Sequence, residues 1–327
     1  MSEQNSQAMT TLPRGSRKPI PRCIVVFGAS GHIGRPLAEH LRYKAPDVKL
    51  RLVSSDAVKR ADLQQAFPQA ECVKADLLDA ASLEPALAGA EGVFIVTPAP
   101  FDEATAMKNF IEVARRVARP VHVVRIVGFE PESSPRRVPE TLRRYGGTAQ
   151  QHYVAKRLLD ESDLPVTYLN IGATYMDNLL LAAPTIRAKG MLIWPQRVIP
   201  FLDPRDLGEI GANLLLSPDE RHLHQFLTLN NGQDLLSVEE VAQMLSDVLK
   251  VEIGRDPSRQ GFIDAYGAQL ARRRGRPDAA AQTLDFLEYE QGNSAFQSLN
   301  DAAERILGRK PTSLRSWLME HRAKFLP

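Results

Sequence analysis

Short apolar runs alternate with stretches of helical periodicity along the first half of the chain. The runs contain consecutive apolar residues rather than an apolar and polar alternation, which is typical of strands with both faces covered. This pattern predicts strands at Cys23–Phe27, Lys49–Val53, Ala70–Lys74, Gly92–Thr97 and Val121–Val127, with helices at Ile33–Tyr43, Ala57–Phe67, Leu83–Ala88 and Phe101–Ala118. Repeated β/α units favour an α/β fold with an open, doubly wound, mostly parallel sheet.

Three glycines follow the first strand in the order Gly28-Ala-Ser-Gly31-His-Ile-Gly34. Gly28 permits a tight turn, Gly31 leaves room for a diphosphate against the backbone, and Gly34 lets the next helix pack closely. The N-terminal amides of that helix would face the phosphates. The motif predicts a Rossmann-type dinucleotide site, with expected contacts from Gly28, Ser30, Gly31, His32, Ile33, Gly34 and Arg35.

The end of the second strand bears on the choice of cofactor. An acidic residue there binds the ribose 2′-hydroxyl of NAD, whereas basic and hydroxyl groups accommodate the 2′-phosphate of NADP. Ser54 stands at the expected acidic position, followed by Ser55 and Lys59, and Arg35 is available after the glycines. NADP(H) is therefore preferred, although Asp56 keeps NAD(H) open.

Residues that follow the other strands should complete the cofactor site. In a doubly wound sheet the ligand lies at the carboxyl ends of the strands. Asp76 could face the adenine, but capping of its own loop is the favoured interpretation, and Asp79 is expected to cap a helix. The further expected cofactor contacts are Asp76, Leu77, Thr97, Pro98, Val127 and Gly128.

A helix beginning near Gln151 carries the candidate catalytic residues His152, Tyr153 and Lys156. Their spacing lets all three share part of one helical face. A hydride delivered to a carbonyl or quinone leaves negative charge on oxygen, and His, with a pKa near about 6.5, can supply a proton at neutral pH. A solvent-facing helix that happens to carry these residues is the alternative. No lysine has a tyrosine four residues before it, so the Tyr-x-x-x-Lys pair is absent.

The second half is rich in expected helices. Asp206 is expected to cap a helix at Leu207–Leu216, and Ser237 and Glu240 form a predicted capping box for a helix that runs to Leu249. Further helices are expected at Phe262–Arg273, Ala279–Tyr289, Asp301–Leu307 and Leu314–Lys324. We expect a disordered tail at 1–20, an NAD(P)-binding domain at 21–170, and a mainly helical substrate-side region at 171–327, partly interleaved with the sheet.

Composition narrows the function classes. The 327 residues carry a net charge of +2, of which +3 lies in the first 22, so the body is not built to bind nucleic acid by charge. No apolar run is long enough for a membrane helix. Cys23 and Cys72 lie in or beside predicted buried strands, which indicates reduced thiols and a cytoplasmic location. No metal-ligand cluster is evident. The oligomeric state stays open, with a homodimer as one option.

The chain resembles the NmrA-like family of atypical short-chain dehydrogenases/reductases. Gly28–Gly34, Ala75–Leu77 with Leu87–Thr97, His152–Asn178, and Phe201–Asp206 are similar to four characteristic stretches of that family. The resemblance covers nearly all of residues 22–327. It implies a Rossmann-type fold and NADP(H) chemistry, as in the family's quinone and dye reductases, isoflavone and phenylcoumaran-type reductases, and redox-sensing regulators.

The resemblance also implies roles for single residues. His152 occupies the position where members carry a Lys or His near the nicotinamide, whereas Lys156 falls where several members have Glu. Gly172 would pass near the nicotinamide, and the substrate side would be formed by Tyr175, Met176 and Asn178. The leading hypothesis is an NADPH-dependent reductase of a quinone, aromatic or other conjugated small molecule. A regulator that senses NADP(H) and binds a protein partner is the alternative, and an epimerase-like isomerase is disfavoured by the missing Tyr-x-x-x-Lys pair.

Overall fold

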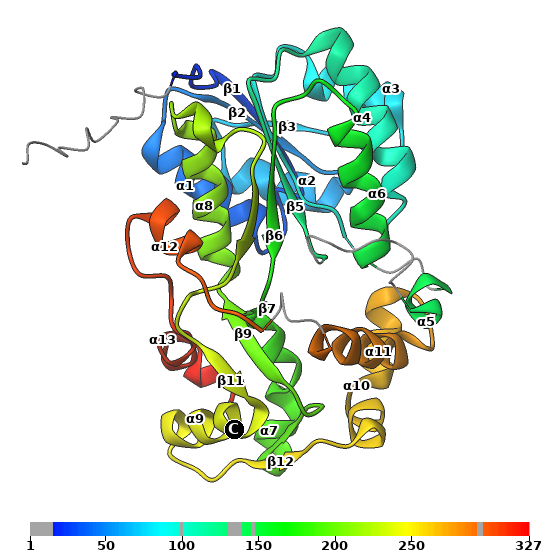
Figure 1. Ribbon diagram of the computed structural model, residues 1–327, viewed down its shortest axis with the longest axis vertical. Coiled ribbons are helices and arrows are strands. Elements are labelled where there is room, and N and C mark those ends of the chain that lie inside the picture. Colours follow the sequence, from blue (N-terminus) through cyan, green and yellow to red (C-terminus); the bar gives the residue numbers. More distant parts are fainter. Residues whose placement is uncertain (1–15, 99–100, 130–138, 145–147, 293–296, 327) are drawn as a thin grey trace, which may run out of the picture.

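Seven parallel strands form the central sheet of the computed structural model, which describes residues 16–98, 101–129, 139–144, 148–292 and 297–326 (Figure 1). The order across the sheet is β10-β6-β5-β4-β1-β2-β3. The strands are β1 (Cys23–Phe27), β2 (Lys49–Val53), β3 (Glu71–Val73), β4 (Gly92–Ile95), β5 (His122–Val127), β6 (Val166–Ile171) and β10 (Phe226–Leu229). Residues 1–15 of the predicted tail and 130–138 of the loop after β5 lie outside the described residues.

The chain reverses its direction of travel across the sheet beside β1. It runs from β1 through β2 to β3 at one edge, then returns to β4 on the other side and continues through β5 and β6. All residues of β1, β4 and β5 are buried, as the unbroken apolar runs predict. The reversal leaves the carboxyl ends of β1 and β4 as the place where a ligand fits between diverging connections.

Helices cover both faces of this sheet. Helices α1, α2, α8 and α12 supply one core cluster, and α3, α4 and α6 supply the other. Among the described helices, none is long and apolar enough to cross a membrane. Their bounds are α1 (Gly34–Lys44), α2 (Ala57–Ala66), α3 (Ala80–Leu87), α4 (Glu103–Val117), α6 (Thr148–Asp160), α8 (Pro204–Leu216) and α12 (Ala302–Leu307).

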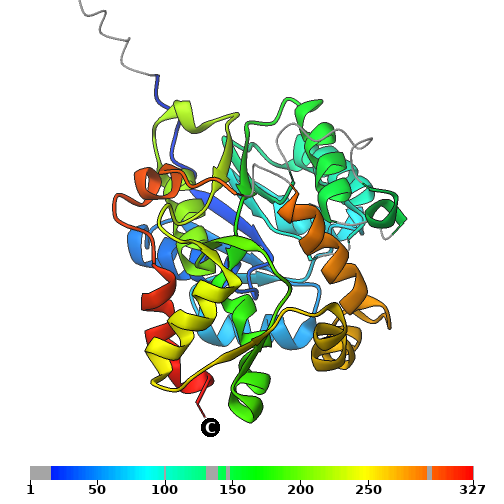
Figure 2. The same cartoon turned by 60° about the horizontal axis from the view of Figure 1, so that its bottom comes forward.

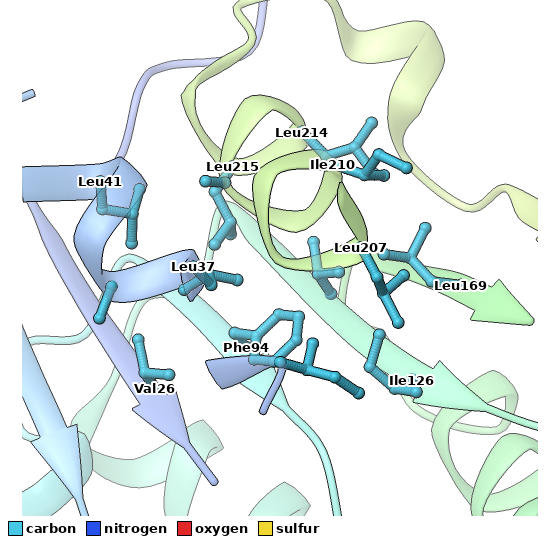
Figure 3. Packing of buried hydrophobic residues seen from close by; sticks show 14 of the residues in the cluster. Val26, Leu37, Leu41, Phe94, Ile126, Leu169, Leu207, Ile210, Leu214 and Leu215 are labelled. Carbon is cyan, nitrogen blue, oxygen red and sulfur yellow. The ribbon is translucent and has the colours of Figure 1, made fainter. Parts of the chain in front are cut away.

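Helix α1 packs directly against α8. Leu37 of α1, Leu207 of α8 and Phe94 of β4 are fully buried in one cluster, which Figure 3 shows from close by. A Cβ atom at Gly208 of α8 would lie only 2.7 Å from the carbonyl oxygen of Ile33, so glycine allows the two backbones to approach. Helix α8 therefore fixes the position of the N-terminus of α1.

A second lobe lies below the sheet in Figure 1 and comes forward in Figure 2. Its own core includes Phe262, Tyr266 and Trp317. It contains small sheets of order β11-β9-β7 and β12-β8. Because α8, β10 and α12 return to the central sheet, residues beyond 170 help to build both lobes. The remaining elements are β7 (Thr174–Tyr175), β8 (Met191–Ile193), β9 (Val198–Leu202), β11 (Leu235–Ser237), β12 (Gly254–Asp256), α5 (Glu140–Arg144), α7 (Ala183–Lys189), α9 (Val238–Leu249), α10 (Arg259–Arg274), α11 (Ala279–Gln291) and α13 (Leu314–Glu320), with short 3₁₀ helices η2 (Met176–Leu181), η3 (Glu220–His222) and η5 (Arg322–Lys324).

Two of the predicted helix caps are confirmed and one is wrong. Asp79 accepts a hydrogen bond from the backbone at the start of α3, and Ser237 and Glu240 make both bonds of a capping box on α9. The N-cap of α8 is Asp203, not Asp206. Asp206 lies in the first turn, where its buried carboxylate accepts a hydrogen bond from Arg309 at 2.7 Å. It therefore anchors the C-terminal segment to α8.

Both cysteines are free thiols, as the sequence predicts. Cys23 is buried in β1 and Cys72 is partly buried in β3. Burial raises the pKa of each thiol. Because the thiolate is the reactive form, neither sulfur is activated.

Candidate functional site

The glycine loop turns from β1 into α1 where side chains would clash. Gly28 has a φ of +78°, and a Cβ atom there would lie 2.9 Å from the carbonyl oxygen of Val96. At Gly34 a Cβ atom would lie 2.3 Å from the carbonyl oxygen of Gly28, and at Gly31 it would lie 3.3 Å from the same oxygen. The tight turn and the close helix packing predicted for Gly28 and Gly34 are therefore confirmed.

The N-terminus of α1 is open to an anion. Among the described residues none caps it with a side chain, and its first turn contains no acidic residue. In contrast, α2, α3 and α4 each begin with an Asp whose carboxylate accepts a backbone N–H. In this turn the N–H of Arg35 donates to the carbonyl of Gly31, and Pro36 carries no N–H. The positive end of the helix dipole favours a phosphate at α1. Ser30, His32 and Arg35 are exposed around this end, and Ile33 is buried. A dinucleotide diphosphate fits this position.

The acidic residue that follows β2 caps a helix. Asp56 is the acidic residue for which NAD(H) remained a possible cofactor. It is the N-cap of α2, and its carboxylate accepts the N–H of Lys59 at 2.9 Å. That bond lowers the pKa of Asp56. Ser54 is buried and bonds the backbone of Asp56, whereas Ser55 and the Lys59 side chain are exposed. The acidic group is therefore engaged in the helix cap.

The other expected cofactor contacts follow β3 and β4 on the same edge. Asp76 accepts the N–H of Leu78 at 2.9 Å, as the loop-capping interpretation predicts. Leu77 is buried and its carbonyl accepts a bond from Asn109. Pro98 is exposed at the end of the described part of this loop.

A buried ion pair that the sequence analysis missed lies beneath this edge. Arg125 of β5 and Glu103 of α4 are 0% and 1% exposed and meet at 2.5 Å. Thr97 bonds both of them, at 2.9 Å from the Arg125 guanidinium. In the sequence, the signal for this ion pair is Arg125, a charged residue inside the mostly apolar strand β5. The pair ties the end of β4 to β5 and to α4.

His152 lies against this network at the end of β5. The backbone N–H of Gly128 donates to its Nδ1 at 2.8 Å, and its Nε2 lies 3.7 Å from Glu103. Because Nδ1 accepts, the proton of the neutral ring is on Nε2. Burial, and then the charge of Arg125, hold the pKa of His152 well below its ordinary value. The expectation that His152 titrates near neutral pH is therefore corrected: the ring is neutral and offers an Nε2–H donor.

The other two residues of the expected catalytic face lie elsewhere. Lys156 pairs with Asp160, one turn along α6, and its ammonium lies 4.9 Å from the centroid of the Tyr168 ring. Tyr153 packs edge-on against Phe129, with ring centroids 6.3 Å apart. The helix thus directs His152 toward the sheet edge, Lys156 toward an ion pair and Tyr153 toward a hydrophobic contact.

The glycine loop touches the second lobe. Nδ1 of His32 lies 2.6 Å from Oδ2 of Asp177, and the His32 ring packs edge-on against Tyr175. Burial, and then Asp177, raise the pKa of the Tyr175 hydroxyl. Tyr175 therefore adjoins the phosphate-facing loop, on the side expected for the substrate.

The remaining substrate-side residues differ in exposure. Gly172 directly follows β6, and its N–H donates to the carbonyl of Leu229. Met176 is fully buried in the core of the second lobe, whereas Asn178 is exposed. Met176 is thus placed as a packing residue. Val127, buried at the end of β5, directly precedes the Gly128 amide that binds His152.

Comparisons with known proteins agree with this architecture. Residues 28–180 match the model of an NAD(P)H-binding family. The chain is 26% identical over 306 residues to an NAD(P)H azoreductase of Xenophilus azovorans, covering 92% of this chain and 99% of the relative. It is 25% identical over 311 residues to a (4-alkanoyl-5-oxo-2,5-dihydrofuran-3-yl)methyl phosphate reductase of Streptomyces griseus subsp. griseus, covering 93% and 99%.

The fold is also that of a solved reductase. The NADPH complex of a quinone oxidoreductase from Escherichia coli superimposes with a TM-score of 0.75 at 20% identity, covering 92% of this chain and 99% of that one. The glycine loop, the strand order and the matched family model agree with one another. Residues 28–180 are an NAD(P)H-binding domain, and the chain is an NAD(P)H-dependent oxidoreductase that resembles the NmrA-like atypical short-chain dehydrogenases/reductases.

Proposed function

We propose that this protein transfers a hydride from NADPH to a quinone, aromatic or other conjugated small-molecule acceptor. The observation that carries the proposal is the neutral His152, whose Nδ1 is held by Gly128 at the same sheet edge as the uncapped N-terminus of α1. Bound NADPH supplies the hydride. The glycine loop holds the diphosphate, and Nε2–H of His152 donates a hydrogen bond to the acceptor oxygen as negative charge develops there.

The choice of NADPH over NADH rests on the groups after β2. Ser54, Ser55, Lys59 and Arg35 supply hydroxyl and basic groups for a 2′-phosphate, while the carboxylate of Asp56 caps α2. A ribose 2′-hydroxyl would need a free acidic acceptor. The names of the two curated relatives, an azoreductase and a reductase of a dihydrofuran phosphate, support a small unsaturated acceptor.

Steady-state kinetics test the proposal. The absorbance of NADPH is followed with purified full-length protein and a panel of quinones, enones and azo dyes. We expect saturable oxidation with at least one class, and a kcat/KM for NADPH at least about tenfold above that for NADH. Tight nucleotide binding with no turnover across the whole panel would contradict the proposal and favour the sensor alternative. We also propose that the protein is cytoplasmic and forms a homodimer. Sedimentation of the native protein tests the oligomeric state.

A further inference from the structure

Arg197 is a buried cation that uses few of its donors within the described part of the chain. Its side chain is 4% exposed, and its Nη2 lies 3.1 Å from Oε2 of Glu290 and 3.5 Å from Oγ1 of Thr174. Among the residues that the structure describes, its buried Nε and Nη1 atoms have no hydrogen-bond partner. A guanidinium carries five N–H donors and a permanent charge. The Nε–H and both Nη1–H bonds are thus left for an acceptor from outside this part of the chain.

The guanidinium lies beyond the carboxyl end of β6. Thr174 begins β7, just after the chain leaves the carboxyl end of β6. Glu290 belongs to the last turn of α11. Tyr289 of the same turn packs against the core cluster that contains Phe129, which follows β5. The guanidinium therefore lies between the chain leaving β6 and a helix that packs against this core cluster.

The surrounding backbone holds Arg197 in place. The N–H of Val198 donates to Oε1 of Gln291 at 2.8 Å, which ties the start of β9 to the end of α11. The carbonyl of Arg197 accepts the N–H of Val238 at 3.2 Å. The cation is thus positioned before any ligand arrives, which lowers the entropy that binding has to overcome.

Glu290 is an incomplete partner for this cation. Burial raises the pKa of its carboxyl group, while Arg197 acts in the opposite direction. A buried charge is tolerated when it is paired and its hydrogen bonds are filled. One carboxylate at Nη2 leaves the Nε and Nη1 donors available for the oxygens of another anion.

We propose that Arg197 is the binding site for an anionic group of the acceptor, so that preferred acceptors are conjugated molecules with a carboxylate, sulfonate or phosphate substituent. The substituent oxygens would accept hydrogen bonds from the free guanidinium donors, and the conjugated part would extend toward His152. This inference rests on the reductase function proposed above, and it names the class of acceptor.

A matched pair of acceptors tests the inference. NADPH oxidation is measured with a naphthoquinone and with its sulfonate. Arg197→Gln should lower kcat/KM for the sulfonate roughly 10- to 100-fold and change that for the neutral quinone less than about threefold. Arg255→Gln is the control, because Arg255 lies in β12 of the same lobe and pairs with Glu239 at 2.7 Å. It should leave both values unchanged.

Glu290→Gln gives a test of opposite sign. The amide oxygen of glutamine still accepts from Nη2, but the substitution removes a negative charge beside the guanidinium, so kcat/KM for the sulfonate should rise. If the pair served only to stabilise the fold, both variants would lose activity equally with both acceptors, and that result would overturn the inference. Thermal unfolding of each variant shows whether it is folded at the assay temperature.

A binding measurement separates this inference from the proposed function. Naphthalene sulfonate and naphthol are titrated calorimetrically into the protein with NADP⁺. Sulfonate binding that Arg197→Gln weakens, in a protein that oxidises no NADPH, would support the anion site while the reductase function fails. Turnover of neutral quinones without any preference for the sulfonate would overturn the anion site while the reductase function stands.

Discussion

At the residue scale, the ring of His152 is held by a main-chain donor at Nδ1 and by burial around it. We predict that His152→Gln lowers kcat about 100-fold, because a preorganised donor to the developing charge is lost. The KM for NADPH should stay the same. Lys156→Gln, one turn along α6, is the matched control and should change kcat less than about threefold, because Lys156 pairs with Asp160. Equal losses in both variants would contradict the assignment.

The pH profile tests the protonation state of the same ring. Since the pKa of His152 lies well below its ordinary value, the ring stays neutral from about pH 8 down to well below about 6.5. The kcat/KM of the native protein should therefore show no inflection near about 6.5. An inflection there that disappears in His152→Gln would show a charged, proton-donating histidine instead.

Single residues were predictable where their role is local. The turn and packing roles of Gly28 and Gly34 follow from the motif itself, and Asp79 caps the helix that begins beside it. Arg197 escaped prediction because its partner Glu290 is distant in the chain. The neutral state of His152 escaped for the same reason, since it depends on burial and on the nearby charge of Arg125 from another element.

At the scale of elements, the packing of α8 on α1 depends on glycine. Gly208→Ala places a Cβ atom 2.7 Å from the carbonyl oxygen of Ile33 and 2.8 Å from the backbone nitrogen of Leu37, so the helices have to separate. We expect a loss of about 1–3 kcal/mol in the free energy of unfolding. NADPH binding should also weaken, because the positive end of the α1 dipole faces the phosphate position. Urea unfolding and nucleotide titration measure the two effects.

Gly267→Ala is the control for this substitution. Gly267 lies inside α10, and the nearest neighbour of an added Cβ atom would be Ile263 at 3.8 Å, an ordinary contact. Alanine there should stabilise the protein by about 0.5–1 kcal/mol through helix propensity. If Gly208→Ala were equally stabilising, the close approach of α1 and α8 would not matter for the fold.

Elements were predictable where the pattern is strong. The buried runs of β1, β2, β4 and β5 and the helices between them follow from consecutive apolar residues and helical periodicity. The start of α8 was misplaced, although Pro204 at its first turn marks Asp203 as the cap. An apolar helix preceded by two aspartates offers two caps, and the structure uses Asp203 as the cap while Asp206 bonds Arg309.

At the scale of the whole molecule, the sheet is assembled from distant parts of the chain. β10 joins the sheet beside β6, although the second-lobe elements β7 to β9 lie between them in sequence. Its residues are mostly half-buried, so its apolar pattern is weak. Such long-range pairing depends on the tertiary fold, which local periodicity does not encode.

A buried histidine should make the free energy of unfolding of the whole molecule depend on pH. His122 of β5 bonds Leu214 of α8 and Thr167 of β6, and burial lowers its pKa to about 3. The unfolded chain takes up this proton near about pH 6.5, and the native protein does not. The free energy of unfolding should therefore fall by about 1.4 kcal/mol per unit as pH drops from about 6.5 toward 3.

Comparing the native protein with a variant that lacks His122 isolates the contribution of this histidine to the pH dependence. Urea unfolding of the native protein and of His122→Gln is compared between about pH 7.5 and 5, above the range where most carboxylates titrate. The variant should be less stable at the higher pH but have a shallower pH dependence. Parallel curves for the two proteins would contradict a neutral, buried His122.

Hydride transfer from NADPH is tested most directly by a single turnover with isotopic label. The protein is loaded with NADPH deuterated at the transferred position, and the best acceptor in which the hydride reaches carbon is added. We predict one NADPH oxidised per acceptor reduced, with the deuterium on the product carbon. NADPH that stays reduced beside bound acceptor, or a reduced product without deuterium, would contradict hydride transfer.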